Sequence, residues 1–185
     1  MEGDESKNEP TSDNRETGGT VGPERASLMV ELRLATDADV EATLADLCVH
    51  MSGQQRDLFG EKLLRYVRKP DRDLMVAIHG GQIVGLVCVI EQAVVPGTFP
   101  EEVGERLRRF ASCTQLLVHP HLRRQGIGTS LFSRLENWAR DRGRGGCWLV
   151  TRRMADWYRN HFDYEELGRI REKGIEKVIM AKKFE

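Results

Sequence analysis

The stretch LLVHPHLRRQGIGT, residues 116–129, constrains this chain more than any other part of it. An apolar strand ends at Pro120, which cannot donate to a strand ladder, and a basic turn follows. The turn opens directly into a helix, whose first N–H groups are free and carry the positive end of the dipole. Gly126 and Gly128 leave room for phosphate oxygens to approach those groups. The arrangement predicts a diphosphate site.

Two familiar phosphate loops do not fit this turn. A dinucleotide loop needs a third glycine where Leu131 stands, and a Walker loop needs a lysine that is absent. The pattern that remains is Arg-x-x-Gly-x-Gly, residues 123–128, and Arg124 adds a second positive charge at its rim. Placed between a strand and a helix, it resembles the coenzyme A diphosphate loop of the GNAT superfamily of acetyl-CoA-dependent N-acetyltransferases.

Hydrophobic periodicity divides the rest of the chain into short alternating strands and amphipathic helices. Thr36 and Asp39 form the start of the first helix, and His79-Gly80-Gly81-Gln82 has the composition of a hairpin turn. The order of elements predicts a mixed α/β layer. Strands are expected at 29–34, 74–78, 83–90, 113–118, 147–151, 165–171 and 175–182, and helices at 36–51, 60–68, 101–109, 126–142 and 155–161.

The first 28 residues differ in composition from the remainder. They hold seven acids and three bases, a net charge of −4, and almost no apolar side chain. Such a segment cannot offset its ordering entropy, so residues 1–28 are expected to form a disordered acidic tail. Residues 29–185 are expected to form one domain. It carries 25 bases and 22 acids, interspersed, which argues against a nucleic-acid-binding domain.

The resemblance to GNAT proteins covers residues 30–183 and implies their fold. That fold is a mostly antiparallel, seven-stranded mixed sheet with helices on both faces, in which the fourth and fifth strands splay apart. The segment 149–162 looks closest to the branch that includes the N-acetylglutamate synthases, whose strand similarly ends in Leu-Thr before an aromatic-rich helix. Because family members are often dimers, a homodimer is also implied.

In this family, acetyl-CoA lies between the splayed strands and a neutral primary amine attacks its thioester directly. The resemblance implies that backbone groups hold the pantetheine and the diphosphate, and that the N–H of Val118 faces the acetyl oxygen. The acceptor side would be built from the first two helices, the 92–112 connection and the last two strands. The predicted acetyl-CoA residues are Leu116, Leu117, Val118, Arg123, Arg124, Gln125, Gly126, Ile127, Gly128 and Thr129.

Tyr158 is the candidate proton donor to the leaving thiolate, with a packing role as the alternative, because family members often place a tyrosine there. The usual Gly-Phe after this helix is replaced by His161-Phe162, which puts the aim of Tyr158 in question. The base is less determined, because the fourth strand has no carboxylate. Glu91, His119 and a water relay are the candidates. The altered segment and missing carboxylate also allow a non-catalytic acyl-CoA-binding regulatory module.

Composition excludes several other classes. No run of apolar residues is long enough to cross a membrane, and no secretory leader is readable. The four cysteines are far apart in the sequence and lack the spacing of metal ligands, so neither a metal site nor disulfides are expected. Reduced cysteines of this kind predict a cytoplasmic location. The Arg/Gly run at 140–146 is interpreted as a helix end, and Arg152 and Arg153 as a solvated pair, with an acidic acceptor or a CoA phosphate as the alternative.

Overall fold

The computed structural model describes residues 28–92, 94 and 98–185. The predicted acidic tail therefore lies outside the described residues, apart from Leu28. Within the described part, no helix is long and apolar enough to cross a membrane.

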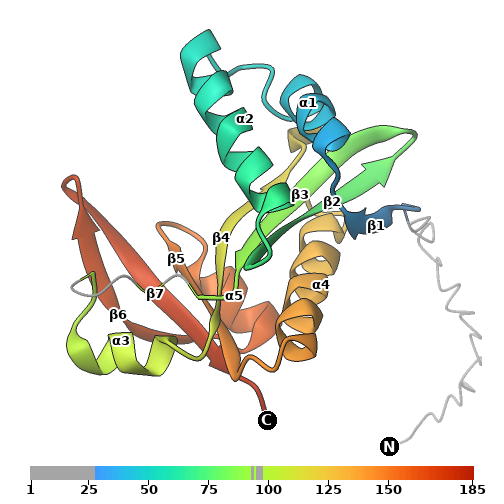
Figure 1. The fold of residues 1–185 in the computed structure, drawn as a ribbon. Helices are drawn as coiled ribbons and strands as arrows, with labels where there is room; N and C mark the ends of the chain where they lie inside the picture. Colours follow the sequence, from blue (N-terminus) through green and yellow to red (C-terminus); the bar gives the residue numbers. More distant parts are fainter. Residues whose placement is uncertain (1–27, 93, 95–97) are drawn as a thin grey trace, which may run out of the picture.

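One seven-stranded sheet organises the chain, in the order β1-β2-β3-β4-β5-β7-β6 (Figure 1). All neighbours are antiparallel except β4 and β5, which are parallel. This confirms the predicted fold. The strands are β1 Glu31–Leu34, β2 Arg72–His79, β3 Gln82–Ile90, β4 Ala111–Val118, β5 Gly146–Thr151, β6 Glu165–Glu172 and β7 Ile175–Lys183.

Helices cover both faces of this sheet (Figure 1). Side chains of α1 and α2 pack on one face of β2 and β3, and those of α4 pack on the opposite face. Helix α5 lies on the same face as α4, but against β7. Helix α3 joins the α1–α2 face but covers the other half of the sheet, where Leu107 meets Trp148 and Ile179. The helices are α1 Asp37–Asp46, α2 Gly53–Arg68, α3 Glu101–Leu107, α4 Ile127–Asp141 and α5 Ala155–Phe162.

Local sequence signals account for the start of α1. Thr36 and Asp39 form the predicted capping box, and the Asp39 carboxylate also accepts two hydrogen bonds from Arg33, at 2.7 and 2.8 Å. The Arg33 guanidinium holds the pKa of Asp39 well below its usual range. Helix α1 is therefore anchored to β1 by a charged pair as well as by its own cap.

The structure extends one predicted helix substantially. Helix α2 begins at Gly53 rather than near residue 60. Its first five residues, GQQRD, carry no apolar side chain, so no apolar stripe marks the start of the helix in the sequence. A short 3-10 turn, Pro120–Leu122, was also not predicted. The other elements lie within two residues of their expected ends, apart from α1, which ends at Asp46 rather than 51.

Gly85 on β3 lets α4 lie unusually close to the sheet. A Cβ there would stand 2.9 Å from a methyl group of Leu131 and 3.2 Å from one of Ile127. Both contacts are closer than side chains tolerate without movement. The close approach fixes the beginning of α4 beside the last residues of β4, and this junction builds the candidate site.

Candidate active site

Strand β4 changes partners halfway along its length. Its first part is paired on both sides, and the parallel pairing with β5 consists of three residue pairs that end at Cys113 and Leu149. Beyond this point β4 continues beside β3 alone, up to the pairing of Val118 with Gly85. The second half of β4 is therefore not paired with β5, and we call the space between these two unpaired strand ends the wedge.

The backbone of β4 presents polar groups to this wedge. The N–H of His119 donates to the carbonyl of Val84 at 2.8 Å, which marks a hydrogen-bonded position of the antiparallel ladder. In such a ladder, alternate residues direct their N–H and C=O away from the partner strand. The backbone groups of Val118 and Leu116 therefore face the wedge, where no β5 residue is in register with them.

The turn between β4 and α4 has two residues in the left-handed region. Arg124 has φ of 60° and Gly126 has φ of 86°. A Cβ placed on Gly126 would meet nothing within 4 Å, so the space beside the turn is open. Arg123 supports the turn, because its Nε donates to the carbonyl of Val118 at 3.2 Å. The free N–H groups at the start of α4 adjoin this opening.

A cavity of about 400 Å³ joins the wedge to this turn. It brings together most of the predicted acetyl-CoA residues. Gln125 does not line it, but bends back so that its amide donates to the carbonyl of His121 at 3.4 Å. Ile127 does not line it either, because its side chain is buried in the core. The lining residues are Leu116, Leu117, Val118, Arg123, Arg124, Gly126, Gly128, Thr129, Met154, Trp157 and Tyr158.

Tyr158 lies in the wall of this cavity although only 7% of it is exposed. Burial, with a smaller contribution from Cys113, raises the pKa of its phenol well above the usual value. The hydroxyl therefore stays protonated at neutral pH and has a proton to donate. The absence of the usual Gly-Phe after this helix does not move Tyr158 away from the cavity. Helix α5 continues to Phe162, and Asp163 takes the left-handed conformation that ends it.

Sequence reasoning missed Met154 and Trp157, which complete the wall on the α5 side. Trp157 is half-buried against Phe132, with 6.3 Å between ring centroids. The sequence offered one indication that Trp157 lies at the cavity, which is its position next to Tyr158 in an aromatic-rich helix. Exposed Met154 belongs to no motif, and only the three-dimensional structure places it at the cavity.

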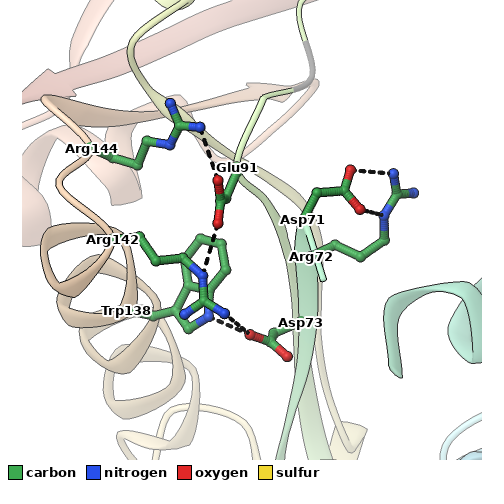
Figure 2. A network of polar contacts seen from close by, with 7 residues as sticks. All are labelled: Asp71, Arg72, Asp73, Glu91, Trp138, Arg142 and Arg144. Atoms are coloured by element: carbon green, nitrogen blue, oxygen red, sulfur yellow. Dashed lines mark hydrogen bonds and ion pairs between the residues drawn. The ribbon is translucent and has the colours of Figure 1, made fainter. Parts of the chain in front are cut away.

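Glu91, the candidate base, is held away from the cavity in an ion-pair network (Figure 2). Its carboxylate accepts from Arg142 at 3.0 Å and from Arg144 at 3.1 Å. Arg142 also donates to Asp73, which accepts from the indole of Trp138. Glu91 follows the last residue of β3, at the opposite end from Gly85 and the wedge. The structure does not bring it together with the other predicted residues.

The other groups of interest, which are the candidates His119, Arg152 and Arg153 and the thiol of Cys113 on β4, also lie outside the cavity lining. Cys113 is buried, and burial raises the pKa of its thiol far above the usual value, so it is no thiolate nucleophile. His119 is half-buried beside His121, whereas Arg152 and Arg153 are exposed. All four cysteines are free, and no metal-ligating cluster exists among the described residues.

This fold and site define a class: an α/β domain with a parted pair of parallel strands and a glycine turn at the mouth of the wedge. The sequence profile of the acetyltransferase (GNAT) family matches residues 40–164, and the chain belongs to that family. No curated protein sequence matches it significantly.

Solved structures agree on the fold. The N-acetyltransferase PaiA from Thermoplasma acidophilum, in complex with coenzyme A, is 16% identical, with a TM-score of 0.60 over 84% of this chain and 99% of that one. The ribosomal-protein-S18-alanine N-acetyltransferase of Escherichia coli is 18% identical, with a TM-score of 0.61 over 84% and 94%. Aminoglycoside 6′-acetyltransferase type Ii is 19% identical, with a TM-score of 0.62 over 83% and 96%.

Proposed function

We propose that this protein transfers the acetyl group of acetyl-CoA to a primary amine by direct attack of the amine on the thioester. The observation that carries the proposal is the cavity at the point where β4 leaves β5. It joins wedge-facing backbone groups, a glycine turn with two arginines, and a buried phenol in one wall. Its neighbour from Thermoplasma acidophilum, solved with coenzyme A, supports the same donor.

Each part of the cavity suits one part of acetyl-CoA. The open space at Gly126, the N–H groups at the start of α4 and the two arginines suit a diphosphate. Wedge-facing groups of Leu116 and Val118 suit the amide-rich pantetheine. The N–H of Val118 would stabilise the negative charge that develops on the acetyl oxygen. Trp157 and Met154 would keep water from the thioester.

The reaction needs two proton transfers, one from the attacking amine and one to the leaving thiolate. The attacking amine must lose a proton, and no carboxylate lines the cavity among the described residues, so water is the proposed relay. Glu91 is not needed for this step. The leaving thiolate takes a proton from Tyr158, whose burial keeps the phenol protonated.

The acceptor itself does not follow from the comparisons. Two of the similar structures are a ribosomal-protein-S18-alanine N-acetyltransferase and an aminoglycoside 6′-acetyltransferase, whose acceptors differ in size and charge. Segment 149–162 resembles the N-acetylglutamate synthase branch, but this resemblance does not identify the acceptor. The residues of the segment that line the cavity lie where we propose that acetyl-CoA binds. A homodimer and a cytoplasmic location also stay predictions.

Calorimetry with acetyl-CoA, followed by a screen of amines for release of coenzyme A, tests the proposal. Tyr158→Phe should lower kcat by roughly 100-fold, because general-acid catalysis is typically worth at least that much, and leave acetyl-CoA affinity within about twofold. Tyr164→Phe is the matched control. Tyr164 is also buried and packs on the same Phe132 ring, but it does not line the cavity. Absence of any acyl-CoA binding would refute the proposal.

The pH dependence of kcat gives a second test. The raised pKa of Tyr158 means that its donating form persists through pH 10. Activity should therefore rise as the amine loses its proton and show no alkaline fall below pH 10. A fall near pH 8 that disappears in Tyr158→Phe would contradict this assignment.

The second candidate function is a non-catalytic acyl-CoA-binding module. The lack of a carboxylate among the described cavity-lining residues favours it. It predicts acetyl-CoA binding without release of coenzyme A across amino acids, polyamines, aminoglycosides and peptides. Turnover with any one of these amines would exclude it.

A further inference from the structure

Thr114 stands at the point where the sheet gives β4 the least support. The last residue of β4 in register with β5 is Cys113. On the other side, the register with β3 shifts between Cys88 and Val89, so that no β3 residue lies opposite Thr114. A bulge and the end of a parallel ladder therefore coincide at one residue.

Helix α2 supplies contacts that the sheet does not. The phenol of Tyr66 and the hydroxyl of Thr114 are hydrogen-bonded at 2.5 Å. One turn earlier in the helix, the ammonium of Lys62 donates to the side-chain oxygen of Gln115 at 3.4 Å. These contacts join segments that are 48 and 53 residues apart in the sequence. Two side chains of α2 therefore hold the bulge of β4 in place.

Tyr66 is a firm anchor for such a contact. Only 3% of it is exposed, and it packs in the cluster that joins α2 to β2 and β3, with Leu63 and Leu74. Burial raises the pKa of its phenol, so the hydroxyl remains neutral. Thr114, in contrast, is exposed. The position of Thr114 in β4 is therefore fixed by its contact with Tyr66 of α2.

We propose that Tyr66 is a positioning residue for the acetyl-bearing arm of acetyl-CoA. Leu116 and Val118, whose backbone groups face the wedge, follow the bulge by two and four residues. Because successive strand residues face opposite ways, the bulge decides which backbone groups reach the wedge. By holding Thr114, Tyr66 aims those groups. The inference rests on the proposed function, because it assigns Leu116–Val118 to the thioester arm.

The test separates the two halves of the ligand. Tyr66→Phe keeps the buried ring and removes only the hydroxyl. We expect it to weaken acetyl-CoA binding about fivefold, the equivalent of one hydrogen bond, measured by calorimetry. Affinity for the 3′-phosphoadenosine diphosphate half of coenzyme A should stay within about twofold, because the turn at Gly126 is untouched. General loosening of the fold would change both affinities together.

Variants of the partner residue complete the design. Thr114→Val should reproduce the loss, Thr114→Ser should keep wild-type affinity, and the double variant with Tyr66→Phe should lose no more than either single one. Thr114 is exposed, so these variants keep the test valid if Tyr66→Phe fails to fold. Tyr164→Phe again serves as the control.

The outcomes distinguish this inference from the function on which it rests. If the wild-type protein binds no acetyl-CoA, the proposed function fails. If the wild type binds but Tyr66→Phe and Thr114→Val bind equally well, only the positioning role is overturned. Equal loss of affinity for acetyl-CoA and for the nucleotide half also overturns it.

Discussion

The two ends of β4 are built in contrasting ways. At its first residues the strand is paired on both sides, and the adjoining ends of β2, β3 and α4 are tied by the network of Glu91 and Asp73 (Figure 2). At its last residues it is paired on one side, beside a cavity and a turn with left-handed residues. The contrast teaches that one end holds the fold together while the other leaves polar groups free for a ligand.

The largest expected effect comes from the two glycines that flank α4. Gly126 and Gly143 both have positive φ, and a Cβ at either would meet nothing within 4 Å. Gly126→Glu places a carboxylate at the proposed diphosphate site and should weaken acetyl-CoA binding at least about 100-fold by repulsion. Gly143→Glu adds the same charge and backbone strain at the closed end, and calorimetry should show unchanged affinity. An equal loss of acetyl-CoA affinity in both variants would contradict the proposed difference between the two ends of β4.

A smaller effect is expected at the closed end. Glu91→Gln removes the charge shared by Arg142 and Arg144 and should lower the free energy of unfolding by about 1 kcal/mol, measured in urea. Acetyl-CoA affinity and kcat should not change. A large fall in kcat at unchanged stability would instead support the base role that the sequence suggested.

The smallest effect concerns the C-terminal end of α5, where Asp163 lines a surface hollow together with Phe110 and Arg140 and not the cavity. Asp163 has φ of 58°, a conformation that glycine adopts without strain. Asp163→Gly should raise the free energy of unfolding by about 0.5 kcal/mol, whereas Asp163→Ala should lower it. Both should leave kcat unchanged. A kcat that falls with Asp163→Gly would show that this helix end also aims Tyr158.

The donor side was predictable because its chemistry is local. A strand, a glycine turn and a helix start are contiguous, so residues 116–129 reveal their arrangement directly. Tyr158 was found from the resemblance, and the structure places it at the cavity. The alternation of apolar residues likewise predicted the strands. The composition of residues 79–82 predicted the hairpin turn, in which Gly80 and Gly81 both have positive φ.

The rest depended on contacts distant in sequence. Arg142 and Arg144 were interpreted as complements to a helix dipole, and nothing local showed that they meet Glu91, 51 and 53 residues earlier. The same holds for Tyr66 and Thr114. The first turns of α2 were missed because their exposed polar residues carry no periodic signal.

The short ladder between β4 and β5 has a mechanical consequence. With three residue pairs between them, few main-chain hydrogen bonds resist rotation of one half of the sheet against the other. At the start of this ladder Gly146 has no room for a side chain, because a Cβ there would collide with the carbonyl oxygen of Lys182 on β7 and stand 2.9 Å from the ring of Phe110. A side chain at position 146 would therefore push β5 away from β7 or from Phe110, right beside the three residue pairs that join the two halves of the sheet.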